Sequence, residues 1–322
     1  MKRTFVALLA AVLIPVVYAG ATRLLFDFNV LQGFTAVMSL SFLIGVPLAM
    51  GYLAIALSGE KQTAGVGYCL FAPWVSVFAF MGLSILFDME GFACWIMVLP
   101  IFLIVSSIGG LIARAVKRGK SRRSQKLQGT VVLFLPLLMS PLEKLIPAET
   151  TRYEAYTYAD IHASRSNIWH HVTRVSTIAE EEDHGYLTRW LGFPRPIRAE
   201  LNYSGVGGSR QAMFSKGLVF NETVRQFEDL RMMRFTIKVD PAAIRPSAMD
   251  KHVVIGGAYF DVLDGTYLLE KTNDSTCRLH LYSHFTLRTT FNGYAAWWAG
   301  LIMKDIQNNI LGIIKTRCEL HL

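Results

Sequence analysis

Paired histidines are the first residues in this sequence whose type and spacing suggest metal chemistry. His170 and His171 are adjacent, and adjacent side chains on a helix point about 100° apart, so both cannot bind one ion unaided. His280 and His284 share one face of a predicted strand, where their spacing of four residues is ~13 Å, whereas histidine binds zinc at ~2.0–2.1 Å. We therefore expect no metal, and nothing else in the sequence indicates a cofactor.

A glycine cluster is the second feature that suggests chemistry, because glycine-rich loops can cradle a phosphate. The cluster consists of Gly205, Gly207 and Gly208. A phosphate loop must lead into a helix, but the residues that follow alternate like a strand, so we interpret the cluster as a turn. The sequence also contains no Walker loop, dinucleotide fingerprint, nucleophile elbow or HExxH motif.

The composition indicates that part of the chain lies in a membrane. The chain has 322 residues, enough for at least two regions, and 52% of them are hydrophobic while 17% are charged. Soluble proteins contain about 45–50% apolar and about 25% charged residues. A single soluble domain is therefore excluded, and the 20 Phe, 12 Tyr and 6 Trp residues argue against a disordered chain.

The net charge of +8 belongs mainly to the first half of the chain. Residues 1–148 carry 12 Lys and Arg against 5 Asp and Glu, whereas residues 149–322 carry 20 against 19. Seven of these cations lie within residues 114–126, with no acid among them. A basic loop between apolar segments is typical of a cytoplasmic membrane loop. We therefore predict a lipid bilayer, and no nucleic acid, as a partner.

Three charge-free segments are long enough to cross a membrane. Residues 34–57, 65–87 and 91–113 each exceed the ~20 residues that a spanning helix needs. Glycine and proline inside them are compatible with spanning, because neighbouring helices can satisfy the freed backbone groups. These segments define the core of a membrane region that we assign to residues 1–147.

Two further apolar segments are ambiguous. Residues 5–20 are interpreted as a retained first helix, with a signal peptide cleaved near Ala19 as the alternative. Residues 129–146 are a marginal span, because Pro136 and Pro141 also suit a re-entrant or interfacial segment. The prediction is an α-helical membrane bundle of four or five spans.

The distribution of Lys and Arg predicts the orientation of this bundle. With the N-terminus in the cytoplasm, ten cations fall on the cytoplasmic side and only Arg23 falls on the opposite side. We predict an integral protein of the bacterial inner membrane with a cytoplasmic N-terminus. Five spans would place the C-terminal domain in the periplasm, which we favour, and four would leave it in the cytoplasm.

Residues 148–322 change from long apolar runs to alternation, which indicates strands. Predicted strands are 153–161, 197–203, 211–214, 218–227, 232–239, 258–263, 266–272 and 278–291. Predicted turns include 207–208, 215–217, Asp264-Gly265 and 273–275. Predicted helices are 164–175, 180–192 and a long amphipathic helix, 294–317.

This order of elements resembles the helix-grip fold of the SRPBCC superfamily, which includes START lipid-transfer domains. The similarity is strongest to bacterial polyketide cyclase or dehydrase-like proteins. It rests on Gly208-x-Arg210-x3-Phe214-x2-Gly217-x2-Phe220-x-Glu222, on Asp250-Lys251-His252-Val253 followed by Gly256-Gly257-x-Tyr259-Phe260, on Gly265-x-Tyr267-x-Leu269-Glu270 and on residues 292–319. The resemblance covers residues 150–320 and implies an α+β domain with a curved antiparallel sheet around a long C-terminal helix.

In this superfamily a cavity lies between the sheet and the helix, and strand alternation predicts its lining here. One face of the last strand carries apolar side chains that should meet the start of the closing helix. The predicted lining is Leu279, Leu281, Phe285, Leu287, Trp297, Trp298, Leu301 and Ile302. Such a cavity suits a hydrophobic or lipid-like ligand, whereas the alternative is that these side chains simply pack as core.

Two function classes follow from the resemblance. The favoured one is a membrane-anchored protein that binds or transfers a hydrophobic ligand, and the alternative is a cyclase or dehydrase-like enzyme. An enzyme would need an acid/base pair in the cavity. The candidates are Glu222, His252, Tyr259 and Asp261, which could equally close turns and form hydrogen bonds at the rim.

The cysteines add one structural prediction. Cys69 and Cys94 lie in predicted spans and are interpreted as reduced packing residues. Cys277 shares the inward face of the last strand, and Cys318 continues the apolar stripe of the closing helix. These two residues could form a disulfide if the domain lies in an oxidising compartment.

Overall fold

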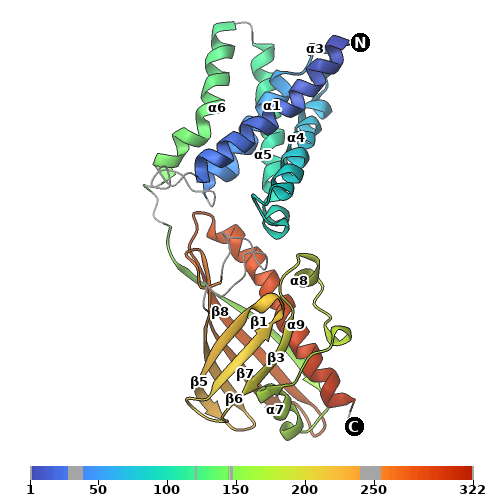
Figure 1. Cartoon of the computed structure of the whole chain (residues 1–322), viewed down its shortest axis with the longest axis vertical. Helices are drawn as coiled ribbons and strands as arrows, with labels where there is room; N and C mark the ends of the chain where they lie inside the picture. Colours follow the sequence, from blue (N-terminus) through green and yellow to red (C-terminus); the bar gives the residue numbers. More distant parts are fainter. Residues whose placement is uncertain are drawn as a thin grey trace. The chain divides into compact units, whose positions relative to one another are not determined.

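The computed structural model describes residues 2–27, 39–119, 122–143, 145, 148–239 and 255–320 (Figure 1). The chain divides into two compact units, Met1–Ala148 and Glu149–Leu322. One candidate residue, His252, lies outside the described residues.

The first unit is helical. Its elements are α1 (Lys2–Asp27), the π-helical turn η1 (Ser41–Gly45), α2 (Val46–Ala56), α3 (Glu60–Thr63), α4 (Val66–Leu86), α5 (Phe92–Arg118) and α6 (Arg122–Glu143). Three helical segments, Val6–Phe26, Val66–Leu86 and Phe92–Arg118, are long and apolar enough to cross a membrane. Two apolar helices, Ser41–Ala56 and Gln128–Glu143, are shorter. Length and composition thus support three crossings, and the total of four or five stays a prediction.

Glycines bring the helices of this unit into close contact. A Cβ atom on Gly51 of α2 would overlap the backbone of α5 at Ser106, and one on Gly109 of α5 would overlap the backbone of α2 at Leu48. Gly110 brings α5 against the backbone of α4 in the same way. Small residues at helix contacts are typical of membrane helices, because packing must replace the hydrophobic effect there.

The second unit consists of one sheet and four α-helical or 3-10 segments before a long final helix. Its elements are β1 (Thr151–Ile161), α7 (Arg165–Thr173), β2 (Arg174–Val175), η2 (Glu180–Glu182), α8 (Leu187–Trp190), β3 (Pro196–Leu201), β4 (Ser209–Phe214), η3 (Ser215–Gly217), β5 (Val219–Glu228), β6 (Met232–Lys238), β7 (Phe260–Lys271), β8 (Cys277–Leu287) and α9 (Asn292–Glu319). The strand order is β1-β8-β7-β6-β5-β4-β3-β2, and the paired strands are antiparallel. The sheet curves, and α9 runs along its concave face (Figure 1).

Apolar side chains from β8 and α9 form the core between sheet and helix. Leu279 and Leu281 belong to a buried cluster with Leu311 of α9. Phe285, further along β8, belongs to a second cluster with Ile313 of α9. The predicted helix-grip architecture, a curved antiparallel sheet with a long C-terminal helix, is therefore confirmed for this unit.

A buried amide fastens α9 to the middle of the sheet. Gln307 Nε2 donates to the carbonyl oxygen of Ala155 (3.1 Å) and to Ser283 Oγ (2.9 Å), and Thr157 Oγ1 donates to Gln307 Oε1 (3.2 Å). Each polar atom of the amide therefore has a partner on β1 or β8, as a buried polar group requires. This network fixes the position of α9 along the length of β1 and β8.

One predicted turn is wrong. The structure has a single strand, β7, through Asp264 and Gly265, with a bulge between Val262 and Asp264. Asp264 does not close a turn, and its carboxylate is paired with Arg152 of β1 and Arg234 of β6. The two strands predicted on either side of this position are one element.

Cys277 and Cys318 are free thiols in the structure, and the possible disulfide between them in an oxidising compartment stays a prediction. They do lie in the same buried apolar cluster, where a thiol packs as a small hydrophobic group. Burial raises the pKa of the Cys318 thiol to about 11, so it stays protonated at neutral pH.

Candidate functional site

Three polar side chains lie buried on the concave face of the sheet. Arg210 of β4, Glu222 of β5 and Tyr267 of β7 expose 4%, 5% and 2% of their surfaces. Arg210 and Glu222 are direct partners across the β4–β5 ladder, which places both side chains on the same face. Buried ionisable groups are rare in apolar surroundings unless a function or a partner retains them. We call these three residues the polar centre.

The polar centre is held by charge and by aromatic rings. Arg210 Nη1 lies 3.3 Å from Glu222 Oε2. The guanidinium carbon of Arg210 lies 5.6 Å from the ring centroid of Phe235 and 5.7 Å from that of Tyr267. Arginine stacks well on such rings, because its charge is delocalised and weakly hydrated. The rings therefore limit where the guanidinium can point.

Two atoms of the polar centre remain without hydrogen-bond partners among the described residues. These are Arg210 Nε and Glu222 Oε2, both of which are buried; Oε2 has only its charge contact with Arg210 Nη1. A buried donor or acceptor that makes no hydrogen bond costs about 1–3 kcal/mol, so a polar group that bonded to these atoms would be stabilising. The ligand chemistry that fits is one polar group that both donates and accepts.

Burial changes the acidity of this site. It raises the pKa of the Glu222 carboxyl, against the opposing influence of the Arg210 charge. It also raises the pKa of the Tyr267 hydroxyl. Glu222 therefore holds a proton to higher pH than an exposed glutamate does, which is the property of a general acid.

The structure places only one of the described acid/base candidates, Glu222, in the polar centre. Asp261 lies at the start of β7 next to Val262, whose side chain is in the core, so alternation directs Asp261 to the opposite face. Tyr259 precedes β7 and contacts Arg288 through its backbone carbonyl. These residues are therefore not brought together with Glu222.

Sequence reasoning missed two members of the polar centre, Arg210 and Tyr267. A signal for Arg210 exists, because it lies two and four residues before Ala212 and Phe214, which both face the core. Tyr267 likewise lies two residues before Leu269, another core residue, and so faces the same side of the sheet. Strand alternation could have placed both side chains inside.

The predicted cavity lining divides into two groups in the structure. The four residues on β8, namely Leu279, Leu281, Phe285 and Leu287, are buried on the concave face. On α9, Trp298 and Ile302 are partly buried, whereas Trp297 and Leu301 are 57% and 39% exposed. At this end of α9 the residues that pack towards the core are instead Ala295, Ala296, Ala299 and Met303.

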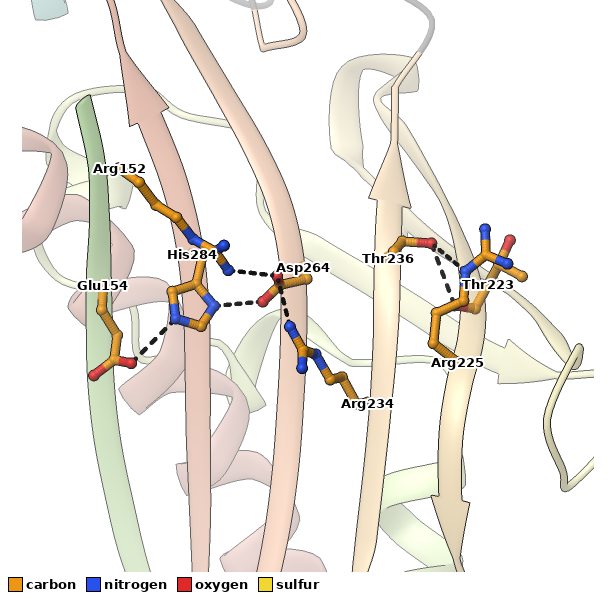
Figure 2. A network of polar contacts seen from close by, with 8 residues as sticks. All are labelled: Arg152, Glu154, Thr223, Arg225, Arg234, Thr236, Asp264 and His284. Atoms are coloured by element: carbon orange, nitrogen blue, oxygen red, sulfur yellow. Dashed lines mark hydrogen bonds and ion pairs between the residues drawn. The ribbon is translucent and has the colours of Figure 1, made fainter. Parts of the chain in front are cut away.

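A second polar network lies on the opposite, outer face of the sheet (Figure 2). His284 Nδ1 lies 2.6 Å from Asp264 Oδ1, and its Nε2 lies 3.2 Å from Glu154 Oε2. Arg152 and Arg234 reach the other oxygen of Asp264, at 3.0 and 3.5 Å. An Asp–His pair can act as a general base only if the second nitrogen is available to a substrate. Here a carboxylate faces each nitrogen, so we interpret the network as ion pairs that link four strands.

In the part of the chain that the structure describes, no group of three or more His, Cys, Asp or Glu side chains is placed to hold a metal ion. The residues of the polar centre themselves offer hydrogen bonding, charge pairing and proton transfer by Glu222 and Tyr267.

Comparisons with known proteins concern the second unit. No family model matches the chain, and no curated protein matches it. Solved structures that are similar include norcoclaurine synthase from Thalictrum flavum, at 13% identity and a TM-score of 0.34, over 54% of this chain and 98% of that one. A START superfamily protein from Mycobacterium smegmatis is similar at 10% identity and a TM-score of 0.34, over 52% and 99%.

These are likenesses of fold alone and say nothing about ligand or activity. The curved sheet, the two short helices that follow β1 and the long α9 give the second unit the helix-grip fold, as the resemblance predicted.

Proposed function

We propose that the protein is anchored in a membrane by its first unit and binds a hydrophobic or lipid-like ligand between the sheet and α9 of its second unit. The observation that carries this proposal is the polar centre, in which the buried Arg210 Nε makes no hydrogen bond to any described residue and the buried Glu222 Oε2 has only its charge contact with Arg210 Nη1. A ligand with a long apolar body and one polar group would satisfy these atoms while its body contacts the apolar concave face.

The exposed side chains at the start of α9 support a ligand that is exchanged with the bilayer. Asn292, the first residue of α9, donates its Nδ2 to the carbonyl oxygen of Glu149 (2.8 Å), six residues after the end of α6 at Glu143. The exposed side chains of Trp297 and Leu301 follow within the next three turns of α9. Tryptophan is enriched at membrane interfaces, so these exposed side chains suit a surface that exchanges its ligand with a bilayer.

The test uses full-length protein purified from membranes in a mild detergent. Native mass spectrometry identifies any retained amphiphile, and cis-parinaric acid, a fluorescent fatty acid, measures binding. We expect the wild type to retain an amphiphile and to bind the probe saturably, and Arg210→Gln to lose both. The matched control is Arg234→Gln, which neutralises an arginine on the outer face and should keep both properties.

Loss of folding would complicate the single variant, so the double variant Arg210→Gln with Glu222→Gln is included. It leaves no unpaired charge in the core and should fold, yet it should bind the probe more weakly because the charged donor is gone. A folded wild-type protein that retains no amphiphile and does not bind the probe would contradict the proposal.

A cyclase or dehydrase-like enzyme acting on the same ligand is the second candidate. It is favoured by the raised pKa of Glu222 together with the presence of the Tyr267 hydroxyl in the same centre. Incubation of the retained compound would decide between the two functions. A change in its mass that the wild type produces and Glu222→Gln does not would support the enzyme, and an unchanged mass in both would support binding alone.

A further inference from the structure

A hollow of about 170 Å³ opens at the surface of the second unit, away from the polar centre. It lies where α8, the start of β3, the turn between β4 and β5, and α9 meet, and Arg189, Arg195 and Lys216 are its cationic lining. We propose that this basic hollow is a binding site for a phosphate-type oxyanion. The proposal concerns a different set of residues from the polar centre and does not depend on it.

Arg195 provides the strongest reason to expect an anion. Its Nη1 is buried and makes no hydrogen bond to any described residue. Its Nη2 lies 3.2 Å from Glu180 Oε1, a carboxylate whose side chain is 75% exposed. A guanidinium binds two oxygens of a phosphate through parallel N–H donors, so a buried and unused N–H at the wall of a hollow suits this ligand.

Two loops hold the cations in fixed positions. Lys216 Nζ donates to the carbonyl oxygen of Gly192 (2.8 Å), while the backbone N–H of Arg195 donates to Ser215 Oγ (2.9 Å) and that of Ser215 donates to the carbonyl oxygen of Arg195 (2.8 Å). Gly192 ends α8 with φ +75°, and Phe193 N–H bonds back to the carbonyl of Thr188. This is the Schellman arrangement, which stops the helix sharply and directs the chain into the hollow. The site is thus organised before any ligand binds.

The backbone at Lys216 is a second, independent indication. Lys216 has φ +60° and Gly217 has φ +81° in the tight turn that joins β4 to β5. Turns with two positive φ values favour Asn-Gly, because a long side chain is strained there. Strained residues that persist are concentrated at functional sites, and this one places an ammonium group at the hollow.

The acids around the hollow limit the ligand to a small negative charge. Asp183 Oδ1 accepts hydrogen bonds from Asn309 Nδ2 (2.7 Å) and from the backbone N–H of Gly185 (3.3 Å), so its charge is used to hold α9. Glu180 is the only other carboxylate in the lining among the described residues. Three cations against two carboxylates favour an anion of one or two charges and disfavour a cation.

The apolar part of the lining indicates room for an organic phosphate. Phe193, Pro194 and Ile306 form part of the wall. Inorganic phosphate and the headgroup of a phospholipid share the chemistry that Arg195 recognises. The experiment therefore uses both as probes, inorganic phosphate and soluble dihexanoylphosphatidic acid.

Binding of each probe to full-length protein in a nonionic detergent is measured by isothermal titration calorimetry. We expect saturable binding that Arg195→Gln weakens at least tenfold, while Arg198→Gln, an exposed arginine on β3 outside the hollow, leaves it unchanged. Glu180→Gln should strengthen binding, because it removes a carboxylate that competes for Arg195. Lys216→Asn should weaken binding while the unfolding midpoint does not fall, because Asn suits this turn.

Tighter binding of dihexanoylphosphatidic acid than of phosphate would identify a lipid headgroup as the ligand, and equal affinity would identify free phosphate; both outcomes support the site. Absence of saturable binding of both probes, or equal effects of Arg195→Gln and Arg198→Gln, would overturn it. Arg210→Gln separates this site from the polar centre, because that variant should lose cis-parinaric acid and keep inorganic phosphate.

Discussion

Gly265 of β7 lies opposite Phe235 of β6, and the phenyl ring occupies the place where a side chain on residue 265 would begin. A Cβ atom on Gly265 would lie 2.5 Å from Cζ of Phe235. The position therefore needs glycine for its lack of a side chain and not for its freedom to turn. An aromatic ring over a glycine on the neighbouring strand also restores the packing that the glycine lacks.

Replacement of Gly265 by alanine should lower the stability of the second unit. An extra methyl group in a packed core costs about 1–3 kcal/mol, because the ring or the backbone must move. Gly312→Ala is the matched control: a Cβ there has no neighbour within 4 Å, and alanine is about 0.8–1.0 kcal/mol more favourable than glycine inside a helix. Thermal unfolding followed by circular dichroism should show a lower midpoint for the first variant and a higher one for the second. Equal midpoints for Gly265→Ala and wild type would refute the packing argument.

The same pair shows what the sequence could and could not predict. Alternation of apolar residues located the strands and the inward face of β8, because period-two patterns report burial directly. Asp264-Gly265 matches the composition of a turn, and only the position of Phe235 on another strand shows that it is not one. A local pattern of apolar residues does not report contacts between strands that are distant in sequence.

The predictions for the polar centre and for α9 were incomplete for related reasons. Glu222 was found, but its partner Arg210 was not, because a charged residue among apolar ones reads as a surface position until its register is known. For α9 the large apolar side chains were assigned to the concave face. The structure uses small ones there, such as Ala295 and Ala299, because the helix approaches the sheet closely at this end and Trp297 is left exposed.

Removing one member of the buried ion pair should cost more stability than removing both. Arg210→Gln leaves Glu222 buried without its cation, and breaking such a pair costs about 3–5 kcal/mol. The double variant Arg210→Gln with Glu222→Gln should recover part of this loss. Urea unfolding of the wild type, the two single variants Arg210→Gln and Glu222→Gln and the double variant gives the coupling energy, and strictly additive effects would show that the pair does not interact.

Titration of Glu222 should make the free energy of unfolding depend on pH. Its pKa is raised in the folded state by burial, so the folded protein binds this proton more tightly than the unfolded chain does. The resulting stability is fully present below the unfolded pKa and is lost as the pH rises through the folded pKa. The free energy of unfolding of wild type should therefore decrease relative to Glu222→Gln as the pH rises above about 4.3.

Glu182 provides the opposite case within the same domain. The hydrogen bonds from Arg317 lower the pKa of its carboxyl, so its contribution is present above the unfolded pKa and is lost as the pH falls. Glu182→Gln should therefore destabilise the protein at neutral pH and have little effect in acid. Parallel curves for Glu182→Gln and Glu222→Gln would contradict both assignments.

Thiol chemistry tests the state of the cysteines. Cys69, Cys94, Cys277 and Cys318 are buried and free. Thiol reagents attack the thiolate, and burial raises the pKa of Cys318 to about 11, so native protein should react slowly. Denatured protein that has not been reduced should titrate four thiols with Ellman's reagent. A value of two that rises to four after reduction would restore the disulfide between Cys277 and Cys318.

The side of the membrane on which the second unit lies depends on the first unit and can be tested with fusions. The cationic stretch 114–126 follows the span Phe92–Arg118 and should stay in the cytoplasm, because Lys and Arg are retained there during insertion. If the short helix Gln128–Glu143 then crosses the bilayer, residues from Glu149 onward lie outside. An alkaline phosphatase fusion after Leu322 should be active and one near Arg122 inactive, with a green fluorescent protein fusion giving the reverse pattern. Phosphatase activity at neither site would show that Gln128–Glu143 does not span the bilayer, and the second unit would then take its ligand from the cytoplasmic leaflet.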